Sequence, residues 1–125
     1  MTCLMTLSCQ SQQADFKSVS VEEFAQVLTD TSVVLLDVRT VEEHMAGHVE
    51  GTALHIDVLK SDFDTLAVAN IPAGSTVALY CRSGNRSKRA ASSLASKGYR
   101  VIELATGYNG WVQAGRPVTV AKETK

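Results

Sequence analysis

The chain has 125 residues, the length of one domain, and this is enough to bury a hydrophobic core without disulfides or metal. Apolar residues make up 45% and charged residues 20%, as in ordinary soluble globular proteins. The formal net charge of −1 gives no electrostatic argument for nucleic acid or an anionic membrane as a partner.

The N-terminal segment MTCLMTLSCQSQQ is weakly apolar and then polar. It lacks a basic region, and its apolar part is too short for a signal-peptide core or a membrane span. Two interpretations stay open. Residues 1–17 are a flexible tail of a cytoplasmic protein, or they are the remnant of a bacterial lipoprotein signal. In the second case the true start lies further upstream, and an exported protein is anchored by acylation of Cys9, which follows Ser8.

Helix and strand signals alternate along the rest of the chain. Ser20 followed by Glu23, and Thr40 followed by Glu43, are capping-box patterns that predict helix starts. Continuous apolar and β-branched runs such as SVVLLDVR predict strands buried on both faces. In chain order we expect a helix to about Leu28, a strand over 32–39, a helix over 40–47, a short strand over 52–56, a helix over 61–70, a strand over 75–81, a helix over 86–98, a strand over 99–104 and a short helix over 107–115.

This alternation predicts an α/β domain with parallel strands, right-handed crossovers and helices on both faces of one sheet. We expect the domain to span residues 18–120, with residues 121–125 as a C-terminal tail. Ligands of such sheets bind outside the carboxyl ends of the strands. Cys81 ends the predicted strand 75–81 and therefore lies at such an end.

Three cysteines, Cys3, Cys9 and Cys81, are too few and too far apart for a disulfide framework, and no CxxC pair suggests zinc. After Cys81, Gly84 and Asn85 allow the left-handed backbone conformation that turns amide groups inward. A helix that begins near Arg86 adds its positive end. This environment predicts a thiol with a lowered pKa that needs no separate base. The alternative is a buried structural cysteine.

Three motifs in this order resemble the rhodanese family, specifically its single-domain sulfurtransferases, from about Val19 to Val118. CRSGNRS is similar to the active-site loop of the family, LLDVRTVEEHMAGHVEGTALHI to the segment around its first buried strand, and GYNGW followed by AGRPV to its closing motif. Many members carry two adjacent glycines where this chain has Thr106 and Gly107, which leaves the local turn geometry open.

The resemblance implies a three-layer α/β/α domain with a mostly five-stranded parallel sheet. It also implies a thiosulfate-type donor, a persulfide on Cys81, and an acceptor such as cyanide or a thiol, including thioredoxin or another thiol protein. No cofactor is expected, and the protein is expected to be a monomer or weak dimer. The loop residues implied to bind the sulfur or its donor are Arg82, Ser83, Gly84, Asn85, Arg86 and Ser87, with Arg82 and Arg86 as the basic residues that hold the donor.

Two other functions stay open beside a sulfurtransferase. One is a sulfur-relay or regulatory binding module that turns over small donors poorly. The other is a phosphatase or arsenate reductase related to the rhodanese family. The loop has six residues from Cys81 through Arg86, one fewer than the related phosphatases carry, and a smaller ring of amides favours sulfur over a tetrahedral oxyanion.

Several polar residues near the same rim have a functional and a structural interpretation. Asp37 and Arg39 could handle substrate, but an ion pair that supports the loop or the following helix is favoured. His48 is expected to be a structural hydrogen-bonding residue. It lies four residues after His44, but Gly47 should end the helix between them, so no metal site is expected. The role of His55 is not determined by the sequence.

Overall fold

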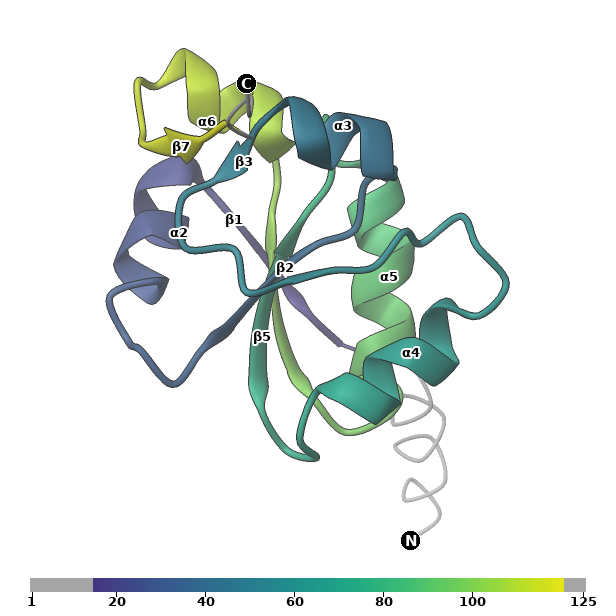
Figure 1. The fold of residues 1–125 in the computed structure, drawn as a ribbon. Coiled ribbons are helices and arrows are strands. Elements are labelled where there is room, and N and C mark those ends of the chain that lie inside the picture. Colours follow the sequence, from purple (N-terminus) through teal and green to yellow (C-terminus); the bar gives the residue numbers. More distant parts are fainter. Residues whose placement is uncertain (1–14, 121–125) are drawn as a thin grey trace, which may run out of the picture.

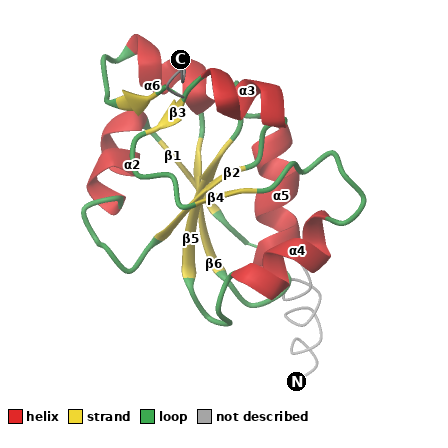
Figure 2. Ribbon diagram, viewed as in Figure 1, coloured by secondary structure: helices red, strands yellow, loops and turns green. Residues whose placement is uncertain are grey.

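The computed structural model describes residues 15–120 and contains a five-stranded parallel sheet with strand order β1-β6-β5-β2-β4, flanked by helices (Figures 1 and 2). This confirms the predicted three-layer α/β/α architecture. The elements are β1 (Lys17–Val19), α2 (Val21–Val27), β2 (Val34–Asp37), α3 (Val41–Ala46), β3 (His48–Val49), β4 (Leu54–His55), α4 (Phe63–Asn70), β5 (Thr76–Tyr80), α5 (Asn85–Ala95), β6 (Arg100–Leu104), α6 (Gly107–Gln113) and β7 (Val118–Thr119).

The central strand β5 divides its side chains between two cores. Val77 and Leu79 pack in the core formed with α4 and α5, and Cys81, which follows the strand, belongs to the same core. Ala78 and Tyr80 point to the opposite face and pack in the core that contains residues of α2 and α6. Figure 1 shows α2 on one side of the sheet and α4 with α5 on the other. The nucleophile candidate therefore faces the start of α5.

Three short strands were not predicted from the sequence. β1 pairs in parallel with β6, with Val19 opposite Leu104. β3 and β7 form a separate antiparallel pair, with His48 opposite Thr119. Strands of two or three residues are too short to show a repeating pattern of polar and apolar residues. Their pairing depends on contacts between distant parts of the chain.

The two expected capping boxes differ in the structure. At Thr40 the box is complete, because its side chain accepts from the Glu43 amide and the Glu43 carboxylate accepts from the Thr40 amide. At Ser20 the prediction was half wrong. The Ser20 hydroxyl accepts from the Glu23 amide at 3.2 Å, but the Glu23 carboxylate lies 3.5 Å from the ammonium group of Lys17. The neighbouring strand β1 supplies that competing cation.

The predictions for Cys3, Cys9, residues 1–14 of the N-terminal tail and the C-terminal tail lie outside the described residues, so the domain boundaries stay a prediction. Lys17, the last residue of the predicted N-terminal tail, is described and is the first residue of β1. Within residues 15–120, none of the helices has both the length and the apolar composition needed to cross a bilayer.

Candidate active site

Cys81 lies directly after β5, between β2 and β6, at the carboxyl edge of the sheet. Only 1% of the residue is exposed. The backbone turns from the strand into α5 at Gly84, which caps the helix with φ of 109°. A Cβ atom there would overlap with the carbonyl oxygen of Ala105. The turn therefore needs glycine for its conformation and for its close approach to the segment after β6.

The sulfur of Cys81 lies within hydrogen-bonding distance of the turn that follows it. The amide of Gly84 donates to Sγ at 3.1 Å, and the thiol donates to the Ser87 hydroxyl at 3.3 Å. Burial alone would raise the pKa of the Cys81 thiol. Hydrogen bonds from the Ser87 hydroxyl and from the amides of Ser87, Gly84 and Ser83 outweigh burial, so the pKa lies below its ordinary value. The site therefore favours the thiolate, the reactive form of cysteine.

The carbonyl groups at the start of the loop point away from the sulfur. The Cys81 carbonyl accepts from the Tyr108 amide at 2.8 Å, and the Arg82 carbonyl accepts from the Asn109 amide at 3.1 Å. A Cβ atom at Gly107 would overlap with these carbonyls. The start of α6 thus satisfies the acceptors of the loop, and the donors remain available for an anion.

Thr106 does not disturb the turn in which many family members carry two glycines. It has φ of −96°, which suits any L-residue, while Gly107 has φ of 67°. The Thr106 side chain occupies the space that a Cβ atom at Gly110 would need. A glycine one turn later thus makes room for the threonine.

The two arginines of the loop have different surroundings. We expected the guanidinium of Arg86 to pair with a dianionic donor. In the structure it instead donates to both carboxylate oxygens of Glu43, at 2.8 and 2.9 Å. This pair lowers the pKa of Glu43 to about 2, with burial opposing the shift. Arg82 is exposed at the edge of the loop. The side chain of Arg82 is therefore the more accessible positive group.

Asp37 and Arg39 form the expected ion pair at the end of β2. Arg39 donates to the two carboxylate oxygens of Asp37 at 2.9 and 2.7 Å, and also to the Gly47 carbonyl at 2.6 Å. Asp37 is fully buried and also contacts Nδ1 of His44 at 2.9 Å. This network joins β2 to the last turn and the C-cap of α3, and so it supports the helix that carries Glu43.

The three histidines form a column that the sequence did not predict. The ring of His44 stacks on His48 at 4.1 Å and on His55 at 4.5 Å between centroids. Nδ1 of His48 lies 3.1 Å from the His44 carbonyl oxygen, and Nε2 of His55 lies 2.8 Å from the Arg39 carbonyl oxygen. Among residues 15–120, no group of three or more His, Cys, Asp or Glu side chains is arranged to hold a metal ion.

Of the predicted site residues, Cys81, Gly84 and Ser87 meet at the sulfur, whereas Arg82, Ser83 and Asn85 have exposed side chains. Two further residues, Glu43 and Glu103, bind residues of the loop and were not predicted as site residues. Glu103 had a detectable signal, because a charged residue inside the apolar strand VIEL needs a partner when that strand is buried.

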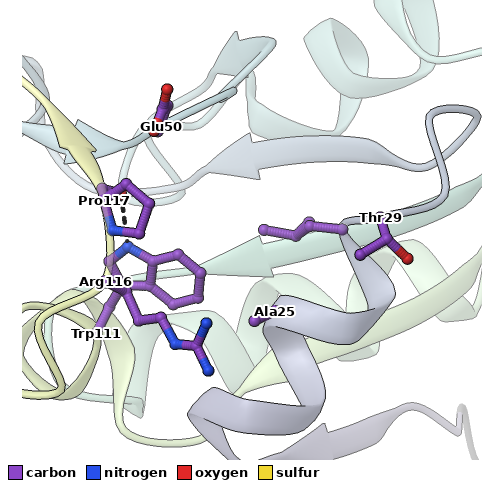
Figure 3. A pocket seen from close by; sticks show the side chains of 7 residues that line it. Ala25, Thr29, Glu50, Trp111, Arg116 and Pro117 are labelled. Carbon is purple, nitrogen blue, oxygen red and sulfur yellow. Dashed lines mark hydrogen bonds between the residues drawn. The ribbon is translucent and has the colours of Figure 1, made fainter.

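Two surface hollows lie on different parts of the domain. One, of about 210 Å³, lies beside the loop and is lined in part by Arg82, Glu43 and Asn109. The other, of about 240 Å³, lies between α2 and the C-terminal segment, where the indole of Trp111 donates to the Pro117 carbonyl (Figure 3). Trp111 is 3% exposed and packs edge-on against Phe24, as expected for a core residue.

Comparisons with known proteins agree on one family. The family model described as Rhodanese-like domain matches residues 20–114. A sulfurtransferase of Allochromatium vinosum is 35% identical over 101 residues, which cover 78% of this chain and 89% of that protein. The thiosulfate sulfurtransferase GlpE of Pseudomonas fluorescens is 34% identical over 100 residues, covering 78% and 86%. The solution structure of a rhodanese-like domain from an Anabaena protein has a TM-score of 0.74 at 20% identity, covering 85% and 80%.

Proposed function

The chain belongs to the rhodanese family, and on that premise we propose that it is a sulfurtransferase in which Cys81 carries the transferred sulfur as a persulfide. The observation that carries the proposal is the position of the Cys81 sulfur, to which the Gly84 amide donates at 3.1 Å, in a turn whose first two carbonyls accept hydrogen bonds from α6. Such a turn stabilises an anionic sulfur, in a thiolate or at the end of a persulfide.

The proposed reaction has two transfers. The Cys81 thiolate attacks the outer sulfur of thiosulfate, a sulfur–sulfur bond forms on the cysteine, and the bond to sulfite breaks with its electron pair. The acceptor, cyanide or a thiol, then attacks the outer sulfur of the persulfide and returns the thiolate. Both steps are nucleophilic displacements at sulfur, and neither needs a cofactor. The thiol acceptor in this proposal can be a protein, such as thioredoxin or another thiol protein.

The loop residues have separate roles in this proposal. The amides of Ser83, Gly84 and Ser87 hold the negative sulfur, in line with their effect on the pKa of Cys81. Arg82 lines the hollow beside the loop and attracts the dianionic donor. Asn85 begins the helix, and Arg86, held by Glu43, contributes positive charge near the sulfur.

The test is a mass spectrum of the intact protein after incubation with thiosulfate. We expect a mass increase of one sulfur atom, mapped to Cys81, which cyanide removes as thiocyanate. Cys81→Ser should abolish both, while Cys9→Ser is the matched control and should retain them. If a persulfide forms with a protein donor but not with thiosulfate, the result would instead favour a sulfur-relay module. Transfer that survives Cys81→Ser would exclude the proposed nucleophile.

A further inference from the structure

Glu103 is a buried carboxylate directly beneath the active-site loop. It lies on β6, is 0% exposed, and belongs to neither the Asp37–Arg39 pair nor the set of loop residues. Burying a charged carboxylate costs several kcal/mol unless hydrogen bonds and a counter-charge offset it. A strand as apolar as VIEL would be more stable with an aliphatic residue at this position. The presence of glutamate there therefore calls for an explanation.

The contacts of Glu103 connect it to the sulfur. The Ser87 hydroxyl donates to its Oε2 at 2.5 Å, and the Cys81 thiol donates to the Ser87 hydroxyl at 3.3 Å. A single line of hydrogen bonds thus runs from the nucleophile through Ser87 to a buried acceptor. The other partners of Glu103 are the Ser18 hydroxyl at 2.6 Å and the Lys88 ammonium at 3.2 Å.

Ser87 has only one hydroxyl hydrogen, so its hydroxyl can donate to Glu103 or to the Cys81 sulfur, but not to both at once. While Cys81 is a thiol, the hydrogen of Ser87 is directed to Glu103. When the sulfur is an anion, the hydroxyl stabilises it only by turning that hydrogen toward the sulfur. Glu103 then loses a donor, unless its carboxyl group is itself protonated and donates to the Ser87 oxygen. Protonation also removes the repulsion between two buried anions on either side of Ser87.

We propose that Glu103 is a positioning residue that takes up the thiol proton of Cys81 through the Ser87 hydroxyl when the sulfur becomes an anion. The S–H bond breaks as an O–H bond forms on Ser87, and the original Ser87 hydrogen moves to Glu103. No electrons are exchanged and the charge of the group is unchanged. This inference rests on the proposed function, because it describes how the same cysteine is prepared for sulfur transfer.

The groups around Glu103 fit a carboxylate that changes its protonation. Lys88 of α5 is the charged group that faces it, with a side chain that is 49% exposed, and Ser18 faces it from β1. Lys88 also donates to the Gly84 carbonyl at 3.0 Å. The ammonium therefore stabilises the charged form of Glu103 and ties the loop to it. The Ser18 hydroxyl can donate or accept, so it suits both protonation states.

The test uses infrared difference spectra of the full-length wild-type protein at one fixed pH, taken between the thiol form and the thiosulfate-generated persulfide. We expect the carbonyl band of a protonated carboxyl group to appear as the sulfur becomes anionic. The band should shift when glutamate is labelled with carbon-13. It should be absent in Glu103→Gln and in Ser87→Ala, and present in Asp64→Asn, which changes a surface carboxylate.

Kinetics give a second readout. Below the thiol pKa, alkylation of Cys81 by iodoacetamide should slow about a hundredfold or more in Glu103→Gln, from the low end of the range for proton-transfer effects upward. The dependence of this alkylation rate on pH should also differ between Glu103→Gln and the wild type. A persulfide formed at that pH without the carboxyl band in wild type would overturn the proposal even if the variant failed to fold. A folded Glu103→Gln protein with an unchanged pH profile would overturn it as well. If the wild type forms no persulfide, the proposed function fails, while the alkylation profiles of the wild type and of Glu103→Gln still decide the role of Glu103.

Discussion

The guanidinium of Arg86 and the carboxylate of Glu43 meet through two hydrogen bonds, at 2.8 and 2.9 Å, across 43 positions of the chain. The pair joins the first turn of the active-site helix to α3. It has two consequences. The charge of Arg86 is partly cancelled before it can act on the sulfur, and the position of the loop depends on a helix that carries no loop residue.

Glu43→Gln should strengthen the positive field at the sulfur. We expect the pKa of Cys81 to fall further and the KM for thiosulfate to decrease by a little over twofold, about 0.5 kcal/mol, as for a partly exposed pair. Iodoacetamide alkylation against pH and thiosulfate kinetics measure the two effects. Glu42→Gln is the control, because Glu42 is an exposed neighbour on the same helix. A higher KM in Glu43→Gln would mean that the pair matters for loop position and not for charge.

Arg82→Ala should mainly raise the KM for thiosulfate, because Arg82 is exposed and lines the hollow beside the loop. The loss should be smaller at high salt, where screening has already weakened the attraction. Arg82→Lys should restore most of the wild-type KM, since a point charge suffices to attract the donor. A reduced kcat with unchanged KM would place Arg82 in the chemical step instead.

Gly84→Ala should disrupt the loop more than an ordinary loss of glycine. Gly84 and Gly74 both have positive φ, 109° and 79°, but only at Gly84 would a Cβ atom overlap with backbone. We expect Gly74→Ala to cost roughly 1–2 kcal/mol of unfolding free energy from backbone strain alone. Gly84→Ala should cost about 1–3 kcal/mol more from the overlap and should raise the pKa of Cys81. Denaturant unfolding and alkylation rates measure both, and equal costs would contradict the overlap.

Asp37→Asn should be far more destabilising than Asp64→Asn, although both break an ion pair. Removing the charge of Asp37 leaves the buried Arg39 without its partner, which costs about 3–5 kcal/mol. Asp64 pairs with Lys97 and its side chain is 51% exposed, so its loss should cost at most about 1 kcal/mol. Urea titrations of the two variants give the comparison. Similar midpoints would show that the Asp37 network stabilises little.

Stability should fall in two stages as the pH is lowered. Burial, together with His48 and His55, lowers the pKa of His44 despite Asp37. The unfolded chain therefore binds a proton below about pH 6.5 that the folded chain resists, and stability falls from there. Glu43 has a folded pKa of about 2 against 4.5, so its contribution is present above 4.5 and is lost between pH 4.5 and 2. Thermal melts against pH should show both stages.

Variants separate these two stages. Glu43→Gln should reduce the second stage and leave the first, and His44→Asn should reduce the first. Glu42→Gln serves as the control with both stages intact. A stability that is constant from pH 7 to pH 5 would show that protonation of His44 does not destabilise the fold.

The sequence was most informative where one residue type is required locally. Strand 75–81, the cysteine at its end and the glycine turn could be predicted, because apolar runs and the conformation of Gly84 are local properties. The partners of the loop that are distant in sequence could not be predicted. Whether Arg86 meets a donor or Glu43 depends on how α3 lies across the sheet, and the stacking of His44 with His55 depends on β2 pairing with β4. Pairing of this kind leaves no signal within a short window.

The sulfur of Cys81 is held largely by backbone amides and a neighbouring hydroxyl. Because every residue except proline carries an amide, substitutions on the outer side of the loop leave most of this support in place. In the proposed function, Cys81 and the surface that selects its reaction partners can therefore diverge independently. Side chains at exposed positions such as Arg82, Ser83 and Asn85 can change to suit other donors or acceptors without removing the backbone amides that hold the sulfur.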